Sequence, residues 1–415
     1  MAPPDPALSL YIHVPFCTDK CLYCDFFSVP RGSVTPTVME KMVSETTKMA
    51  HRLIDSAGSA TRVETLFVGG GTPSCLPAAQ LKTLLGAFSP LGCSEWTVES
   101  NPETLDETFL DECREAGVSR LSVGIQSLKT MHLRTLRRRA TREHGEAAME
   151  LLRKMWDGEL NLDFITGIPG QSVSDVMEDL ASVGGGWPDH VSLYQLTVEP
   201  GTPLETMVDE GRIRLNRSEL DEELWLAARD ALQSRGYRQY EVSNFSVPGR
   251  ECRHNLRYWR IDPYVGAGPG AVSTLPAAWA ARTAARPELA GNGQSVVRLT
   301  APKDIGAFLR GEESFWGIET ELISPTEFLL ENVMMGLRLA GGIPEAMLQS
   351  RFGRGFAESF PGVWEGWVSR GLALPPDGSL KLSPDGLLLL DRLLGDIVAR
   401  LPDVERSGLS VSWPP

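Results

Sequence analysis

The stretch "CTDKCLYCDFF", residues 17–27, places three cysteines within eight positions of a chain that has seven cysteines in all. Such a group of thiols is typical of a disulfide framework, a zinc site or an iron–sulfur cluster. A structural zinc site normally takes four protein ligands, often as two cysteine pairs, and no second pair follows in this chain. Three cysteines in one loop favour a four-iron cluster in which one iron has no protein ligand and can bind another molecule. The remaining alternative is three thiols that only pack in the core.

The composition of the chain limits its expected cellular location and the kinds of partner that it could bind. The chain has 415 residues, of which 42% are hydrophobic, and a net charge of -14, so we expect about two or three soluble domains. No apolar run is long enough to span a bilayer, and the opening residues "MAPPDPALSL" lack the pattern of a signal peptide. We therefore expect a cytoplasmic location, where thiols stay reduced. The acidic balance argues against nucleic-acid binding, which needs a basic face.

Short β-branched segments alternate with helical sequence through the first half of the chain. The expected strands are residues 10–14, 65–68, 96–99, 121–124, 162–165 and 191–196. The expected helices are residues 37–53, 77–87, 104–116, 142–155 and 174–183, and in the third of these Thr104 and Glu107 predict a capping box and Gly117 a terminator. Six such units predict a curved parallel sheet or partial barrel, with its site at the carboxyl ends of the strands.

The second half of the chain has a different rhythm. We expect a helix over residues 218–234, a strand and turn in "YRQYEVSNF", and a loop over residues 263–287. Helices are expected again at residues 326–339, 345–352 and 387–401, with a short β-ribbon in "GLALPPDGSLKLSPDG". The predicted division is a barrel over residues 1–245, a connecting segment over 246–300, and a small winged-helix-like domain over 301–415.

Polar and glycine residues mark the ends of several expected strands. "LFVGGGTPS" contains Gly70, Gly71 and Thr72, and glycines at a strand end let another group approach the backbone closely. Glu99, Gln126 and Asp163 occupy the same position on later strands, where their side chains would face the mouth of the barrel. The alternative for each of these residues is a solvated or satisfied loop position.

The CxxxCxxC spacing of Cys17, Cys21 and Cys24, with Tyr23 before the last cysteine, resembles the radical S-adenosylmethionine (SAM) superfamily. The resemblance implies a partial (β/α)6 barrel, a [4Fe-4S] cluster bound by the three cysteines, and SAM bound to the free iron through its amino and carboxylate groups. It also implies a set of SAM-contacting positions: Tyr11, Tyr23, Gly70, Gly71, Thr72, Glu99, Gln126, Arg138 and Asp163.

Within that superfamily the chain resembles the oxygen-independent coproporphyrinogen III oxidase family, through blocks such as "LYIHVPFCTDKCLYCDF", "VESNPE", "LDFITGIPGQ" and "YEVSNFSVPGRECRHNLRYW". It is most similar to the heme chaperone branch. In the oxidases the third cysteine of the motif begins a CxC sequence, whereas Asp25 and Phe26 follow Cys24 here. Residues 254–259, "HNLRYW", match the HNxxYW motif of the chaperones, which implies heme binding by His254, Asn255, Tyr258 and Trp259. One departure is that the family's Leu-Gly-Arg-x-His reads Leu136-Arg137-Arg138-Arg139-Ala140 in this chain.

The HNxxYW segment also suits heme on chemical grounds. Imidazole is an axial ligand of heme iron, and the rings of Tyr258 and Trp259 offer flat area to a porphyrin. Arg250, Arg253, Arg257 and Arg260 recur at helical spacing, so we expect them on one helix face that could bind propionates. Cys252 is a second candidate for the iron ligand. The alternative is a structural histidine beside a solvated stripe of arginines.

Two functional classes follow from the resemblance. In the first, the protein binds heme and delivers it to client hemoproteins, some of them at the membrane, and Phe26 argues for this class because it replaces the oxidases' cysteine. In the second, it is a radical enzyme that decarboxylates coproporphyrinogen III. SAM cleavage is compatible with either class, and a homodimer is a further expectation. A zinc-bound structural protein is the third alternative.

Overall fold

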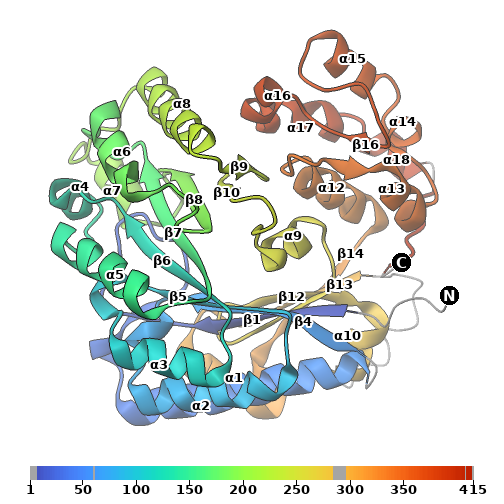
Figure 1. Ribbon diagram of the computed structural model, residues 1–415. Coiled ribbons are helices and arrows are strands. Elements are labelled where there is room, and N and C mark those ends of the chain that lie inside the picture. Colours follow the sequence, from blue (N-terminus) through green and yellow to red (C-terminus); the bar gives the residue numbers. More distant parts are fainter. Residues whose placement is uncertain (1–6, 59–60, 284–295, 407, 414–415) are drawn as a thin grey trace.

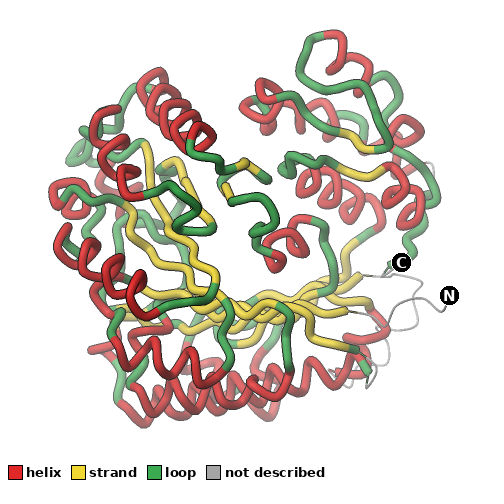
Figure 2. The backbone as a smooth tube through the Cα atoms, viewed as in Figure 1, coloured by secondary structure: helices red, strands yellow, loops and turns green. Residues whose placement is uncertain are grey.

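The computed structural model describes residues 7–58, 61–283, 296–406 and 408–413 of the protein. Its main feature is an open sheet of twelve strands, ordered β14-β13-β12-β11-β1-β4-β5-β6-β7-β8-β10-β9 (Figures 1 and 2). The six strands that the alternating sequence predicts pair in parallel with one another: β1 (Ala7–Val14), β4 (Arg62–Gly70), β5 (Glu95–Ser100), β6 (Arg120–Gln126), β7 (Glu159–Thr166) and β8 (His190–Gln195). β9 and β14 are the two edge strands of the sheet. Because they do not pair with each other in the described residues, the sheet is open and forms a partial barrel.

Helices follow the parallel strands, and most of these helices cover the convex face of the sheet (Figure 1). They are α1 (Pro36–Ala57), α2 (Ala78–Phe88), α3 (Glu107–Ala116), α4 (Thr130–Thr135), α5 (Arg142–Met155), α6 (Val173–Asp179), α7 (Pro203–Asp209) and α8 (Ser218–Ser234). Crossovers of this kind are what parallel pairing requires. The predicted α/β partial barrel is therefore confirmed.

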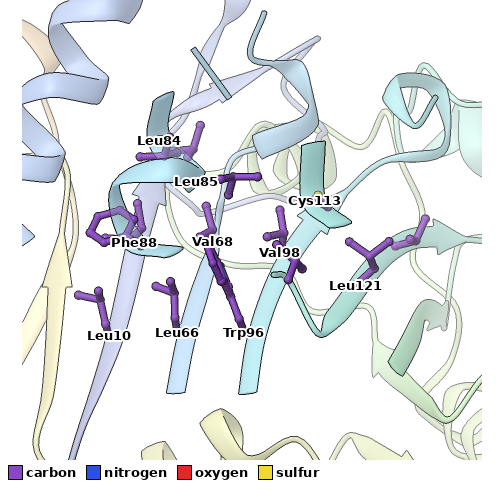
Figure 3. Close-up of a cluster of buried hydrophobic side chains, with 14 of the residues drawn as sticks. Leu10, Leu66, Val68, Leu84, Leu85, Phe88, Trp96, Val98, Cys113 and Leu121 are labelled. Atoms are coloured by element: carbon purple, nitrogen blue, oxygen red, sulfur yellow. The ribbon is translucent and has the colours of Figure 1, made fainter. Parts of the chain in front are cut away.

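The core between sheet and helices is built from apolar side chains that alternate along each strand. Leu66 and Val68 of β4 are fully buried and pack below Leu84 and Leu85 of α2 (Figure 3). Phe88, at the end of α2, closes the same layer. Burial of a side chain of this size contributes about 1.5–3 kcal/mol, so the layer holds the strand ends in register.

One predicted helix start is wrong. The N-cap of α3 is Asp106, whose Oδ1 accepts a hydrogen bond of 2.8 Å from the backbone N–H of Phe109. Thr104 lies two residues earlier, where its hydroxyl pairs with Ser74 at 2.6 Å and closes a short turn. The predicted terminator Gly117 is correct, since it ends α3 in the left-handed conformation.

The predicted loop over residues 263–287 is also wrong in its described part, because residues 264–283 form two strands and a helix. They are β11 (Tyr264–Ala267), β12 (Val272–Pro276) and α10 (Ala277–Thr283). β11 pairs in parallel with β1, and an added Cβ at Gly266 would lie 2.3 Å from the carbonyl oxygen of Val272. Glycine is thus needed for the close approach of two strands. Residues 284–287 of this prediction lie outside the described residues.

The sheet continues through β13 (Val296–Thr300) and β14 (Glu319–Ile323), which pair with each other although they lie on opposite sides of the predicted boundary at residue 301. α11 (Ile305–Arg310) lies between them. At the other end, β8 is followed by the antiparallel strand β10 (Asn244–Ser246), and β9 (Arg238–Gln239) is the last strand. The division at residues 245 and 300 stays a prediction; the structure shows that one sheet extends across both positions.

A second hydrophobic core lies in the C-terminal region, drawn in orange and red in Figure 1. Its helices are α12 (Pro325–Gly336), α13 (Glu345–Phe352), α14 (Phe356–Ser359), α15 (Val363–Ser369), α16 (Pro384–Leu388), α17 (Leu390–Val398) and α18 (Leu401–Arg406). The predicted ribbon is present as β15 (Ile343–Pro344) paired with β16 (Ser379–Leu380). The predicted helix over residues 387–401 is instead divided among α16, α17 and α18. Among the described helices, none has the length and hydropathy to cross a membrane.

Candidate functional site

The first cavity of interest, which we call the cysteine cavity, has a volume of about 380 Å³ and lies at the carboxyl ends of the parallel strands. It gathers nearly all of the residues that were predicted to bind the cluster and SAM. Its lining includes Cys17, Cys21, Tyr23, Cys24, Gly70, Gly71, Thr72, Glu99, Gln126, Arg138 and Asp163. Tyr11 is the exception, since it lines a neighbouring cavity instead. The structure therefore brings together side chains that are up to 146 residues apart.

The three thiols have polar neighbours on two sides. The Thr72 hydroxyl donates to Cys17 Sγ at 3.5 Å, and Arg138 Nη1 lies 3.6 Å from Cys21 Sγ. Burial raises the pKa of Cys17, and it raises the pKa of Cys24 to about 11, so both remain thiols unless a cation is bound beside them. Among the described residues, no three Cys, His, Asp or Glu side chains meet at the spacing of a single ion.

This donor set fits an iron–sulfur cluster. Each iron of a cluster takes its own thiolate, so the ligands surround a volume rather than a point. Hydrogen bonds to the sulfur atoms are a usual means by which a protein adjusts such a cluster, and Thr72 and Arg138 are placed to make them. Arg138 is itself fixed, because its Nη2 donates to Asn101 Oδ1 at 2.9 Å and to the Gly124 carbonyl at 2.7 Å.

The glycines of "GGGTPS" hold the cysteine loop against the sheet. The backbone N–H of Gly71 donates to the Val14 carbonyl at 2.8 Å, and that of Thr72 donates to the Phe16 carbonyl at 2.7 Å. An added Cβ at Gly71 would lie 2.6 Å from both of these carbonyl oxygens. Only glycine allows this approach, so Gly71 fixes the backbone that leads into Cys17.

Two carboxyl groups line the cysteine cavity from β5 and β7, the strands on either side of β6. Glu99 Oε2 accepts a hydrogen bond of 3.0 Å from the backbone N–H of Gly70. Burial, together with the nearby charge of Asp163, raises the pKa of Glu99 to about 8. Burial also raises the pKa of Asp163, although Asn161 donates to it at 2.7 Å. A cationic group would stabilise both carboxylates, so this wall is suited to an ammonium or sulfonium ligand.

Gln126 has two features that are typical of functional positions. Its φ is +64°, an uncommon conformation for a residue with a side chain. Its side chain is buried, and Oε1 has no hydrogen-bond partner within the described residues. A buried acceptor without a partner costs free energy unless a ligand supplies the donor.

The second cavity, which we call the aromatic cavity, has a volume of about 600 Å³ and borders the first. The two share Asp25, Phe26, Gly70, Glu99 and Tyr194. The aromatic cavity also contains all four residues predicted to bind heme: His254, Asn255, Tyr258 and Trp259. They lie on one short helix, α9 (Arg253–Trp259), which Figure 1 shows between the sheet and the C-terminal region. Tyr11, Phe67 and Tyr264 complete its aromatic wall.

The start of α9 is fixed by a carboxylate from the sheet. Glu95 of β5 accepts hydrogen bonds of 2.8 Å from the backbone N–H groups of Arg253 and His254. Cys252 also turns toward this carboxylate, with Sγ 3.4 Å from Oε1. The expectation that Cys252 is a second iron ligand is therefore wrong, because its thiol is buried on the sheet side and does not line the aromatic cavity.

The hydrogen bonds of His254 define its tautomer. Thr65 Oγ1 donates to Ser9 at 3.0 Å, so the same oxygen accepts from His254 Nδ1, also at 3.0 Å. The proton is then on Nδ1, and Nε2 keeps a free electron pair. Burial lowers the pKa of His254 to about 3, so the ring stays neutral. A neutral imidazole whose far nitrogen is held by a hydrogen bond is the usual form of a metal ligand.

The predicted arginine stripe is not a propionate site. Arg250 precedes α9 and pairs with Glu159 at 2.8 Å. Arg257 turns inward, where it donates to Ser9 at 2.7 Å and lies 3.3 Å from Glu64. Among the described residues that line the aromatic cavity, Lys303 is the one Lys or Arg side chain.

Several lining residues were not identified from the sequence. His13 is buried in the wall of the aromatic cavity: Tyr11 donates to its Nδ1 at 2.9 Å, and its Nε2 donates to the Phe27 carbonyl at 2.8 Å. Tyr194 lies at the end of β8 and belongs to both linings. Asn101 lies two residues after Glu99, within the quoted block "VESNPE", and its position directly after β5 was an available signal.

Comparison with known proteins agrees with this arrangement. The profile of the Radical SAM superfamily matches residues 11–183, and that of the HemN C-terminal domain matches residues 323–389. A zebrafish (Danio rerio) protein named Radical S-adenosyl methionine domain-containing protein 1, mitochondrial, is 33% identical over 95% of this chain and 87% of its own length. Proteins named heme chaperone HemW are 31% identical in Synechocystis, over 82% of this chain and 80% of that protein, and 28% identical in Bacillus subtilis, over 95% and 100%.

One solved structure matches nearly the whole chain. It is the coproporphyrinogen III oxidase HemN of Escherichia coli, described as a radical SAM enzyme, with a TM-score of 0.74 and 19% sequence identity. The match covers 95% of this chain and 90% of HemN, so the sheet and the C-terminal region are present in both. At this level of identity the likeness concerns the fold.

Proposed function

Because the chain belongs to the radical SAM family of HemW and HemN proteins, we propose that it is a heme chaperone, which binds heme in the aromatic cavity and delivers it to client hemoproteins. One observation carries the proposal. The four residues of the HNxxYW motif line one wall of a cavity of about 600 Å³, with His254 neutral and its Nε2 unprotonated. The volume is typical of a small-molecule site, and the wall offers both a ligand for iron and flat aromatic area.

The cysteine cavity would hold the cluster and SAM. Cys17, Cys21 and Cys24 are the proposed cluster ligands, and the carboxyl groups of Glu99 and Asp163 are the proposed contacts of the cationic end of SAM. A bound and reduced cluster would supply an electron for cleavage of SAM. The residues of the chain position these groups: Thr72 and Arg138 donate toward the sulfur atoms, and Gly71 keeps the cysteine loop on the sheet.

The proposal extends to location and partners. A cytoplasmic location is supported by the cysteines, since all seven are free thiols. The clients would be hemoproteins, some at the membrane, and association of two copies of the chain is also proposed. No nucleic-acid partner is expected, in line with the net charge of -14.

The test is heme titration of protein that has been reconstituted anaerobically with iron and sulfide. We expect binding of one heme with a visible spectrum of a histidine-ligated iron, and loss of that spectrum in His254→Ala. Cys252→Ala is the matched control, because Cys252 lies two residues away but outside the cavity, and it should bind heme like the parent protein.

Two results would contradict the proposal. Unchanged heme affinity and spectrum in His254→Ala would exclude His254 as the ligand. Loss of carboxyl groups from coproporphyrinogen III without heme affinity would instead support the oxidase alternative, which Phe26 argues against because it stands, 59% exposed, where the oxidases have a cysteine.

A further inference from the structure

A continuous series of polar side chains connects the walls of the two cavities. It begins at Asp163, which lines the cysteine cavity, and ends at Asn255, which lines the aromatic cavity. Between them lie Asn161, His190 and Tyr240, and none of these three lines either cavity. We call the five residues the polar relay.

The distances show direct contacts along the relay. Asn161 Nδ2 lies 2.7 Å from Asp163 Oδ1, and Asn161 Oδ1 lies 2.6 Å from His190 Nδ1. His190 Nε2 lies 2.9 Å from the Tyr240 hydroxyl. The amide of Asn255 is within hydrogen-bonding reach of the same hydroxyl, where it stabilises negative charge on that oxygen.

Each hydrogen bond in the relay determines the next one. Because Asn161 donates to Asp163, its carbonyl oxygen must accept from His190 Nδ1–H. His190 Nε2 is then unprotonated and accepts from the Tyr240 hydroxyl. That leaves the Tyr240 oxygen as an acceptor for the Asn255 N–H, so the carbonyl end of Asn255 is available to the aromatic cavity.

Burial protects the hydrogen bonds of the relay. The exposed fractions of Asn161, His190 and Tyr240 are 4%, 1% and 9%, so water does not compete for their hydrogen bonds. Burial and the nearby positive charge of Arg120 lower the pKa of His190 well below its usual value. The imidazole therefore stays neutral and carries one proton, on Nδ1 in the order given above or on Nε2 if that order is reversed.

Asn161 offers a second arrangement at the Asp163 end. Its Nδ2 also lies 2.8 Å from Ser122 Oγ and 3.0 Å from Ser192 Oγ. When a ligand engages the Asp163 carboxylate, the Asn161 amide can turn over. Its oxygen then accepts from these hydroxyls and its Nδ2 donates to His190 Nδ1, which reverses each later hydrogen bond of the relay. Coupling between two sites needs an element of this kind, with two arrangements that both sites influence.

From this geometry we infer that the polar relay couples the two cavities, with His190 and Tyr240 as positioning residues that set the orientation of Asn255 according to what Asp163 contacts. The inference rests on the proposed function, since the ligands would be SAM in one cavity and heme in the other. A ligand ammonium or sulfonium that contacts Asp163 would change the heme affinity, and by linkage heme would change the SAM affinity by the same factor.

The experiment measures heme affinity with and without saturating SAM, by visible titration of the anaerobically reconstituted protein. For the parent we expect the two dissociation constants to differ by about five-fold or more. Tyr240→Phe removes the hydroxyl and keeps the ring. In this variant the heme dissociation constants with and without SAM should differ by less than about two-fold. Tyr237→Phe is the matched control, because Tyr237 is buried nearby but donates at 2.5 Å to the Pro188 carbonyl, outside the relay; it should keep the parent's ratio.

The outcomes separate this inference from the proposed function. A parent protein that binds no heme would overturn both. A parent that binds heme and SAM with a ratio of one, or a Tyr240→Phe variant that keeps the parent's ratio, would overturn the relay alone. If Tyr240→Phe does not fold, Asn161→Ala interrupts the relay at its other end and should likewise remove the effect of SAM on the heme dissociation constant.

Discussion

The two cavities border each other but differ in chemistry and in origin. The cysteine cavity is lined by thiols, carboxyl groups and a buried arginine, most of them at the ends of consecutive parallel strands. The aromatic cavity has many rings in its lining, and most of these rings come from β1, the loop that holds Phe26 and Phe27, and α9. The first wall is suited to charged groups and metal, and the second to a large flat molecule.

The difference shows how one sheet can support two kinds of site. A parallel sheet repeats the same strand end, so one polar residue per strand is enough to build the first cavity. The second cavity depends on α9, which is held against the sheet by Glu95 at its first turn and by the hydrogen bonds of His254 and Arg257. We expect the first cavity to be sensitive to changes in the strand ends, and the second to changes in this helix.

The largest expected effect is loss of the cluster from the cysteine cavity without loss of heme binding in the aromatic cavity. Cys17→Ala removes one of three thiols, so the variant should bind close to none of the ~4 iron atoms of a reconstituted cluster. Its heme uptake should persist, because Cys17 does not line the aromatic cavity. Iron and sulfide analysis and visible spectra check this, with Cys93→Ala, a thiol outside both linings, as the control. Full iron loading of Cys17→Ala would contradict the assignment of this cavity.

A smaller but still large effect is expected at the wall of the cysteine cavity. Gly71→Ala places a Cβ against two backbone carbonyls, which cannot move without shifting β1, so we expect a loss of about 1–3 kcal/mol in unfolding free energy. Gly86→Ala in α2 has open space around the new methyl group and should gain up to about 1 kcal/mol. Urea unfolding of both variants measures the contrast, and similar effects of the two substitutions would show that Gly71 is not needed for the approach.

The shared residue Glu99 predicts a pH dependence. Its pKa of about 8 is above its usual value, so between about pH 5 and 8 the folded protein holds a proton that the unfolded chain has released. Stability of the cluster-free protein should therefore decrease as the pH rises through this range. Glu99→Gln should remove this decrease of the unfolding free energy with pH, whereas Glu107→Gln, at an exposed position, should keep it. Urea unfolding at several pH values checks this, and equal slopes in all three proteins would contradict it.

The smallest effect concerns the backbone that positions Arg138. Arg137 has a φ of +56° at the position where the family's motif has glycine, so Arg137→Gly relieves the left-handed conformation. The lost strain and the extra freedom of the unfolded chain largely cancel, and we expect a change below about 1 kcal/mol in favour of the variant. Arg134→Gly, inside α4, should instead lose about 1 kcal/mol. Thermal unfolding of the pair gives the sign, and equal losses would show that Arg137 carries no strain.

Much of the first cavity was predictable because each of its residues follows a recognisable strand. The CxxxCxxC loop, Gly70 to Thr72, Glu99, Gln126 and Asp163 all lie where the alternating pattern placed them, along the lining of one cavity. The family's missing glycine did not disturb this, since Arg137 adopts the conformation that a glycine would have. Arg138 consequently reaches the cavity.

The second cavity was only partly predictable, because its walls depend on long-range packing. α9 was identified from its motif, but the direction of its arginines was not, since Arg257 turns inward to Ser9 rather than outward. β11 and β12 were missed because their glycine-rich sequence resembles a loop; partners far along the chain, such as β1, make them strands. His190 and Tyr240 gave no local signal, since each is defined by a neighbour more than 28 residues away.

The open sheet has a consequence for how the protein avoids unwanted association. An open sheet leaves two edges at which a strand of another molecule could add. One edge, β9, has two residues, and the turn that follows it is covered by a bridge between Glu241 and Leu339. The other edge, β14, carries exposed glutamates at positions 319 and 321. Short length, cover and negative charge all disfavour strand addition, so a second copy of the chain would have to dock through its helices or loops rather than extend the sheet.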